Sequence, residues 1–258
     1  MSAVILCQVK QAEQPFYVND VGISLYSAEE LCWFMENNLP LLDRVFFEEP
    51  LQKWIRQELS LERLADTLKS VQEMDREPLT DELAMPVFDE IGWLTAEERE
   101  KVLDTLHRQE LLPAGARKKL RADRLAGYRK YMMAIRLYRE ILSDGGAELA
   151  GSQLAGTIWH NMGVSYARMF QMNEACGCLR KAWDILRSDA VMKSLLCCCW
   201  LRGGREDLDR TGDDCGVAIA FRQEVEKELE QLSSRSMPSD LDQALRGWVE
   251  EYHRETGL

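Results

Sequence analysis

Cysteine and histidine are the residue types here that most often do chemistry, but their spacing does not form a recognisable site. The eight cysteines include the consecutive run Cys197–Cys199 and the pair Cys176 and Cys178. Consecutive residues of a helix point in different directions, and no pair has the Cys-x2-Cys spacing of a zinc site. The three histidines are scattered without acidic or cysteine partners at ligand spacing. We therefore expect no metal site, and cysteines that act as small buried hydrophobic residues in a reducing compartment.

Motifs of known enzyme classes are also missing from the sequence. There is no Gly-x-Ser-x-Gly elbow, no phosphate-binding glycine loop followed by lysine and no dinucleotide fingerprint. Carboxylate pairs such as Glu48-Glu49 are common in a chain with 44 acidic residues. The sequence thus predicts a protein that is not an enzyme and needs no cofactor. An enzyme with an unrecognised site in residues 1–113 stays open as an alternative.

Charge divides the chain into two parts. The formal net charge of −12 argues against nucleic acid as a partner. Residues 1–113 hold 23 acidic and 10 basic residues, whereas residues 114–258 hold 21 acidic and 22 basic residues. Pro113-Ala114-Gly115 lies at the division. We expect an acidic N-terminal domain over 1–113 and a second domain over 114–258.

A strongly basic cluster follows this boundary directly. It could recruit an acidic peptide, dock on the protein's own acidic first half, or form a solvated helix face. Its members are Arg117, Lys118, Lys119, Arg121, Arg124, Arg129 and Lys130.

Targeting signals are not evident. No run of eighteen apolar residues exists, and the short apolar stretch Ala3–Leu6 has no basic region before it. We expect neither a transmembrane helix nor a signal peptide, hence a cytoplasmic protein without a membrane partner.

The elements expected in the first domain begin with short strands. Ala3–Val9, Phe16–Val18 and Ile23–Tyr26 are rich in β-formers, and Asn19–Gly22 is a turn candidate between the last two. This pattern predicts a small hairpin or three-stranded edge.

Helices with recognisable starts are expected to follow. Ser27 with Glu30, and Thr95 with Glu98, have the spacing of capping boxes, in which each glutamate bonds the amide of its capping residue.

Three further helices are predicted from single residues. Pro50 is expected to open one, Ser60 to cap the next, and Thr80 to begin one that Gly92 ends. Apolar residues at helical spacing should face a core. They include Leu31, Phe34, Met35, Leu51, Trp54, Ile55, Leu64, Ala65, Leu68, Val102, Leu103, Leu106 and Leu111.

A repeat pattern distinguishes the second domain. The residues are Trp159-x2-Met162-Gly163-x2-Tyr166, then Ala175-x3-Leu179-x2-Ala182. Gly163 and Ala175 are small, as two closely crossing helices require. This segment closely resembles one tetratricopeptide repeat, a helix-turn-helix unit of about 34 residues.

Phase extends the resemblance in both directions, over about residues 115–232. A step of one repeat length leads from Met162, Gly163 and Tyr166 to Leu196, Cys197 and Trp200, and the turn then falls at Gly203-Gly204. Upstream, Tyr131–Ile141 resembles a second helix. Ala122 takes the small position before it, and the Gly-rich stretch from Ser143 to Ser152 accounts for the extra length up to Gly163.

Beyond the turn at Gly203-Gly204 the phase breaks. We interpret the acidic segment Asp207–Asp214 as an inserted loop, with a helix restarting near Cys215. A last helix over Ser239–Tyr252 is expected to cap the stack. The expected fold is mainly α: a tetratricopeptide-like solenoid of helical hairpins preceded by an α-rich region with a small β-hairpin.

In this family the first helix of each unit lines a concave groove that binds peptides. The resemblance implies groove positions for His160, Asn161, Val164 and Arg168, and for Cys198 and Arg202 in the next unit. Because Arg168 and Arg202 are one repeat length apart, they should project equivalently and could pair with an acidic ligand. Ordinary surface arginines with local ion pairs are the alternative.

Some family members hold a chaperone tail by a five-residue carboxylate clamp. Lys119 and Asn161 fit two of its places, whereas Asp123, Val191 and Leu195 occupy the others. The resemblance thus keeps Lys119 as a groove candidate but does not predict binding of chaperone tails.

Together these features predict an intracellular adaptor that binds a protein or peptide, possibly an acidic one, in its groove. A peptide-responsive regulator with an N-terminal effector domain is the other alternative. The identity of the partner and the oligomeric state are left open by the sequence.

Overall fold

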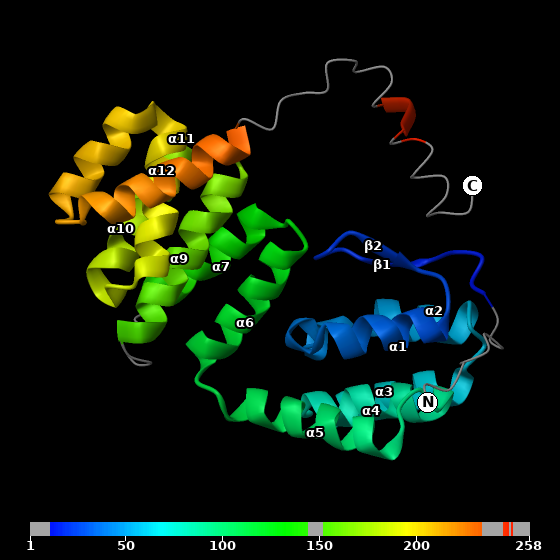
Figure 1. The fold of residues 1–258 in the computed structure, drawn as a ribbon. Coiled ribbons are helices and arrows are strands. Elements are labelled where there is room, and N and C mark those ends of the chain that lie inside the picture. The colour runs from blue at the N-terminus through cyan, green and yellow to red at the C-terminus, as the bar shows by residue number, and fades with distance from the viewer. Residues whose placement is uncertain (1–10, 144–151, 234–244, 248, 250–258) are drawn as a thin grey trace.

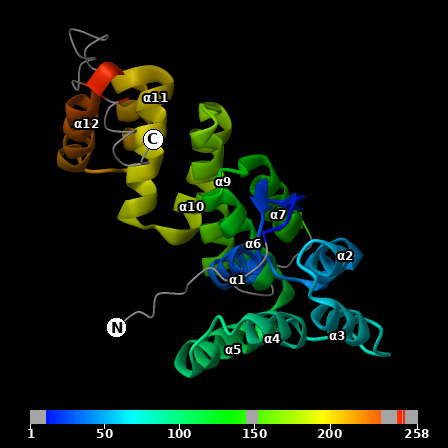
Figure 2. The same ribbon diagram turned by 90° about the vertical axis from the view of Figure 1, so that its right-hand side faces the viewer.

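The computed structural model describes residues 11–143, 152–233, 245–247 and 249, and it is mainly helical (Figure 1). In two views, α11 and α12 lie at the opposite end of the molecule from α3, α4 and α5 (Figures 1 and 2). Within the described residues, no helix is long and apolar enough to cross a membrane.

The first half begins with the predicted hairpin. Strands β1 (Phe16–Val18) and β2 (Ile23–Leu25) pair antiparallel around the turn, where Gly22 has a φ of 72°. The expected strand Ala3–Val9 lies outside the described residues. Helices and 3-10 turns follow: α1 (Ala28–Asn37), η1 (Leu39–Leu41), η2 (Arg44–Phe47), α2 (Glu49–Gln57), α3 (Glu62–Gln72), α4 (Thr80–Ile91) and α5 (Ala96–Leu111).

Helix starts were only partly predicted correctly. Thr95 and Glu98 form their capping box, and the Ser27 hydroxyl accepts the Glu30 amide. The Glu30 carboxylate, however, accepts the amide of Tyr26 and not that of Ser27. Ser60 is also not the cap of α3, because that position belongs to Leu61.

The apolar stripes were mostly confirmed as core, with one error. Leu31, Leu51 and Leu68 are buried, but Leu111 is 85% exposed. Leu111 is the last residue of α5, five positions beyond the last buried residue of that helix, Leu106. Its spacing fits the stripe, but no neighbouring element among the described residues covers it.

The second half consists of helices that pack in chain order. α6 (Ala114–Gly127) packs on α7 (Tyr131–Ser143), α9 (Ser152–Arg168) on α10 (Met172–Leu186), and α10 on α11 (Asp189–Asp214). The crossing of α9 and α10 is close at Gly163. A Cβ atom there would stand 2.7 Å from Leu179 Cγ and 3.2 Å from the Ala175 carbonyl oxygen, so only glycine fits without displacement.

The turns of these hairpins repeat a backbone feature. Arg129, Phe170 and Gly204 have φ values of 59°, 59° and 69°. Their spacing along the chain is the same as that of the small residues Ala122, Gly163 and Cys197. After Arg129 and Phe170 the next amide bonds a carbonyl five positions back, which closes the preceding helix.

The predicted inserted loop over Asp207–Asp214 is wrong. The segment is the second part of α11, which breaks only at Gly203 and Gly204 and then continues to Asp214. Its acidic residues suggested a loop, but Leu208 and Thr211 are buried. The chain then forms α12 (Ile219–Ser233), which packs on α11. The predicted capping helix lies mostly outside the described residues.

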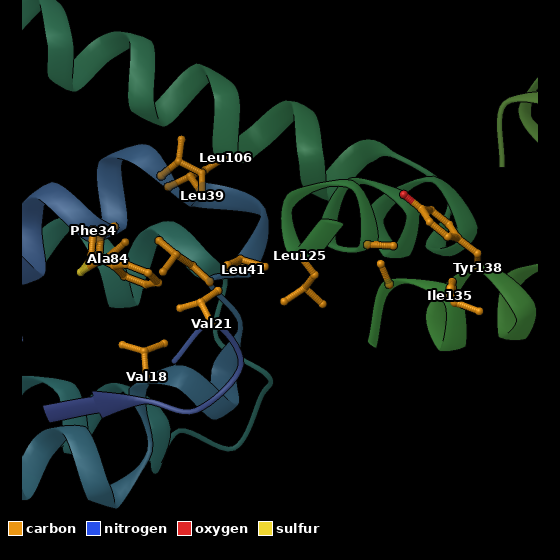
Figure 3. Close-up of a cluster of buried hydrophobic side chains, with 14 of the residues drawn as sticks. Val18, Val21, Phe34, Leu39, Leu41, Ala84, Leu106, Leu125, Ile135 and Tyr138 are labelled. Carbon is orange, nitrogen blue, oxygen red and sulfur yellow. The ribbon is translucent and has the colours of Figure 1, made fainter. Parts of the chain in front are cut away.

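A single core joins the two halves. Figure 3 shows Leu125 of α6 between Leu41 of η1 on one side and Ile135 of α7 on the other. Leu125 and Ile135 are each 1% exposed. The boundary at residue 113 therefore separates charge and helix pattern, but apolar packing continues across it.

Ion pairs of Arg121 and a hydrogen bond of Arg124 reinforce this junction. Arg121 Nη1 donates to Asp43 Oδ2 at 2.5 Å, and its Nη2 donates to Asp20 Oδ2 at 2.5 Å. Arg124 Nε donates to Oδ1 of the fully buried Asn38 at 2.7 Å. These two members of the basic cluster thus dock on the protein's own first half, which was one of the three interpretations of the cluster.

Candidate functional site

A cavity of about 430 Å³ lies among α6, α7 and α9 and brings together four predicted groove residues. His160, Asn161, Val164 and Arg168 share one face of α9, because their spacing follows successive turns of a helix. The full lining is Asp123, Ala126, Gly127, Arg129, Tyr131, Tyr138, His160, Asn161, Val164, Ser165 and Arg168.

A hydrogen-bond network centred on Asp123 shapes the cavity wall. Asp123 Oδ1 accepts from Tyr138 Oη at 2.5 Å and from Asn161 Nδ2 at 2.8 Å. Burial and the bond to Asp123 raise the pKa of Tyr138 well above its usual range, so the phenol stays a donor. The network joins α6, α7 and α9. The side-chain amide nitrogen of Asn161 is therefore already hydrogen-bonded to Asp123.

Lys119 belongs to the same network, which changes its predicted role. Its Nζ donates to Asp123 Oδ2 at 2.6 Å, and its side chain is 17% exposed. Lys119 does not line the cavity. Because its charge is already neutralised by the Asp123 carboxylate, Lys119 offers little to a ligand. The structure thus places Lys119 outside the cavity lining and not at the predicted contact with the ligand.

His160 connects the cavity to the next hairpin. Its Nδ1 lies 3.3 Å from Asn161 Oδ1, and its Nε2 lies 3.3 Å from the Ser194 hydroxyl oxygen of α11. Ser194 follows His160 by 34 positions, so the side chains of successive hairpins contact each other along this surface.

Two arginines give the cavity its positive rim. Arg129 and Arg168 both line it, both are exposed, and neither takes part in an ion pair among the described side chains. Arg129 occupies the left-handed turn after α6, and Arg168 ends α9. Guanidinium groups bind carboxylates and phosphates through paired hydrogen bonds, so this rim favours an anionic group.

The predicted groove residues of the next unit are not at this site. Cys198 is 5% exposed and lies in the core. Arg202 Nε donates to Asp207 Oδ2 at 2.6 Å, and Arg210 also bonds the Asp207 carboxylate. Asp207 is 4% exposed, whereas the side chain of Arg202 is 32% exposed, so the arginine reaches in from the surface to a buried carboxylate. Arg202 therefore fits the alternative of an arginine with a local ion pair.

Sequence reasoning missed Arg129 and the partnership of Asp123 with Tyr138. In the sequence Arg129 belongs to the basic cluster. Its position between the two expected helices of a hairpin indicates a turn, and in the structure that turn borders the cavity. Asp123 follows Lys119 by four positions, a spacing that predicts an ion pair on one helix face. No pattern in the sequence indicated that Tyr138 would reach it from another helix.

Two other cavities have different surroundings. One of about 600 Å³ lies at the junction of the halves, where Arg121 and Asp43 of its lining bond each other. One of about 780 Å³ lies on α2 and α3, where Arg56 and Asp66 pair. In both, at least one arginine of the lining is paired with a carboxylate of the same lining. Comparison of the chain with protein-family models, with curated proteins and with solved structures finds no match.

Proposed function

We propose that this chain is a binding scaffold of tetratricopeptide type, whose groove among α6, α7 and α9 holds an acidic segment of a partner protein or peptide. The observation that carries the proposal is that four residues predicted from the repeat pattern, all on one face of α9, line one cavity together with Arg129. The equal spacing of the positive-φ turns and of the small crossing residues supports the repeat assignment.

The charged groups on the cavity rim favour a negatively charged ligand. Arg129 and Arg168 present two guanidinium groups, whereas the carboxylate of the lining, Asp123, is held by Lys119, Tyr138 and Asn161. Val164 adds an apolar contact on the cavity wall. An extended segment with a carboxylate side chain next to a small apolar residue matches this lining.

Binding to immobilised acidic peptides tests the proposal. The probes are short peptides with alternating Asp or Glu and apolar residues, compared with the same peptides carrying Asn or Gln. We expect wild-type protein to prefer the acidic set, and Arg168→Glu or Arg129→Glu to weaken that binding at least about tenfold by placing like charges together.

Arg63→Glu is the matched control, because it makes the same charge change at an exposed position of α3. Equal loss of binding in the Arg63 variant would show that net charge and not the groove decides affinity. Unchanged binding in both groove variants would remove the cavity from the proposed site. Circular dichroism of each variant checks that the helices are retained.

A further inference from the structure

Two buried thiols face each other between α10 and α11. Cys176 Sγ lies 3.6 Å from Cys199 Sγ, within contact but without a covalent bond. The residues are 23 positions apart in the chain and 5% and 1% exposed. A disulfide bond is about 2 Å long, so the two sulfur atoms must move closer together by less than about 2 Å to be joined.

The surroundings of Cys199 favour its thiolate. The Thr211 hydroxyl donates to Cys199 Sγ at 3.3 Å, and Arg202 Nη2 lies 3.9 Å from the same atom. The hydrogen bond from Cys176, with that from Thr211 and the charge of Arg202, lowers the pKa of Cys199 below that of an ordinary thiol, although burial and Asp207 oppose this. The same contact and burial raise the pKa of Cys176, so one sulfur is the nucleophile and the other keeps its proton.

The remaining described cysteines of this half differ from the pair. Burial is the main cause that raises the pKa of Cys178, Cys197, Cys198 and Cys215, and that of Cys198 reaches about 11. Thiolate character decides which cysteines react with peroxides and disulfides. Four cysteines nearby in the chain or in space therefore serve as internal references for Cys199.

We propose that Cys176 and Cys199 form a redox-active dithiol that a hydroperoxide converts reversibly into a disulfide between α10 and α11. The Cys199 thiolate attacks one oxygen of the peroxide and breaks the O–O bond, which gives Cys199 sulfenic acid and, with hydrogen peroxide, hydroxide. Cys176 then attacks the sulfenic sulfur; the S–S bond forms, and the sulfenic oxygen leaves as water with the Cys176 proton. The two thiols together lose two electrons to one peroxide.

The break in α11 lies close to Cys199 in the chain and is where we expect a small oxidant to enter. Gly203 and Gly204 depart from helical geometry between Cys199 and Thr211, and the second part of α11 is held there by the bonds of Asp207 and Thr211. We expect local opening at this glycine turn to expose the sulfur atoms without unfolding of either helix. Hydrogen peroxide is close in size to water, so a slight opening is sufficient.

The test is treatment of the whole protein with hydrogen peroxide, followed by blocking of free thiols and tryptic mass spectrometry without reduction. Cys176 falls in the peptide Met169–Arg180 and Cys199 in the peptide Ser194–Arg202. We expect these two peptides to be the first joined, with loss of two hydrogens, and to be released by dithiothreitol. The rate of joining should rise with pH as the Cys199 thiolate forms, and this rise should begin at a lower pH than the pKa of an ordinary thiol would give.

Variants assign the bond within these peptides, since each peptide contains further cysteines. Alanine at Cys178, Cys197 or Cys198 should retain the cross-link, whereas Cys176→Ala and Cys199→Ala should each abolish it. A first cross-link to Cys215, a cross-link that survives Cys199→Ala, or intact free thiols in wild type would overturn the proposal. Fragmentation of the joined wild-type peptides also locates the bonded cysteines, so a variant that fails to fold does not leave the proposal undecided.

Discussion

Arg168 and Arg202 occupy equivalent helical positions but have different surroundings. Each ends the first helix of a hairpin, and they are one repeat length apart. Arg168 is exposed on the rim of the α6–α7–α9 cavity, whereas Arg202 is bonded to buried Asp207. The position equivalent to Asp207 in the preceding hairpin is Asn173, which is exposed and carries no charge. The second helix of a hairpin thus decides whether an arginine on the first is available to a ligand.

The largest effect is expected where the hairpin itself is changed. Gly163→Leu places a side chain 2.7 Å from Leu179 Cγ and should lower the free energy of unfolding by about 1–3 kcal/mol or more through overpacking. Gly177→Leu on α10 is the control, because a Cβ there meets nothing within 4 Å. Urea unfolding followed by circular dichroism measures both. Equal stability of the two variants would contradict the close crossing of α9 and α10.

The buried carboxylate of the second hairpin gives the next largest effect. Asp207→Asn should cost about 1–3 kcal/mol, because it leaves the guanidinium of Arg202 without its partner. The bond from Arg202, with that from Arg210, holds the pKa of Asp207 below its ordinary value of 3.8. A depressed carboxyl pKa stabilises the fold above the unfolded value and loses that contribution as pH falls further. The difference between variant and wild type should therefore be full at neutral pH and shrink below about pH 4.

Charge reversal at the two arginines tests the comparison directly. Arg202→Glu should reduce stability by about 1–3 kcal/mol, because it faces Asp207 with a like charge, and Arg168→Glu should leave stability within about 0.5 kcal/mol of wild type. Thermal unfolding of both variants side by side provides the measurement. If Arg168→Glu were the more damaging change, Arg168 would have a structural role.

The smallest effect is expected from giving Arg168 the partner that Arg202 has. Asn173→Asp introduces a carboxylate at the position equivalent to Asp207. An exposed ion pair should change stability by less than about 1 kcal/mol but compete with an acidic ligand for Arg168. Peptide titration should show affinity reduced by roughly two- to fivefold. Asn173→Ser is the control, and the comparison fails if both variants weaken binding alike.

Much of the local structure was predictable because local signals decide it. The turn at Asn19–Gly22, the capping box at Thr95 and the helix stop at Gly92 were each confirmed. The acidic segment Asp207–Asp214 was mistaken for a loop because its charges suggested exposure. In the structure Arg202 and Arg210 neutralise the one aspartate of that segment that is buried.

The candidate site was half predictable. Four of its residues followed from the repeat phase, since equivalent positions of similar hairpins share a face. Lys119 and Cys198 also fit the repeat pattern but do not line the cavity. Lys119 is paired with Asp123, and Cys198 is buried in the core. Periodicity fixes the direction of a side chain relative to its own helix and says nothing of what a second helix places opposite.

The sequence by itself determined the mainly helical content, the hairpin turns and the small residue at the close crossing, because backbone preferences and residue volume act within a few positions. Tertiary structure alone decided that Arg121 and Arg124 dock on the first half, that Asp123 gathers Tyr138 and Asn161, and that Cys176 meets Cys199. These contacts join residues 15 to 101 positions apart. Their formation depends on how whole helices pack, which no local pattern records.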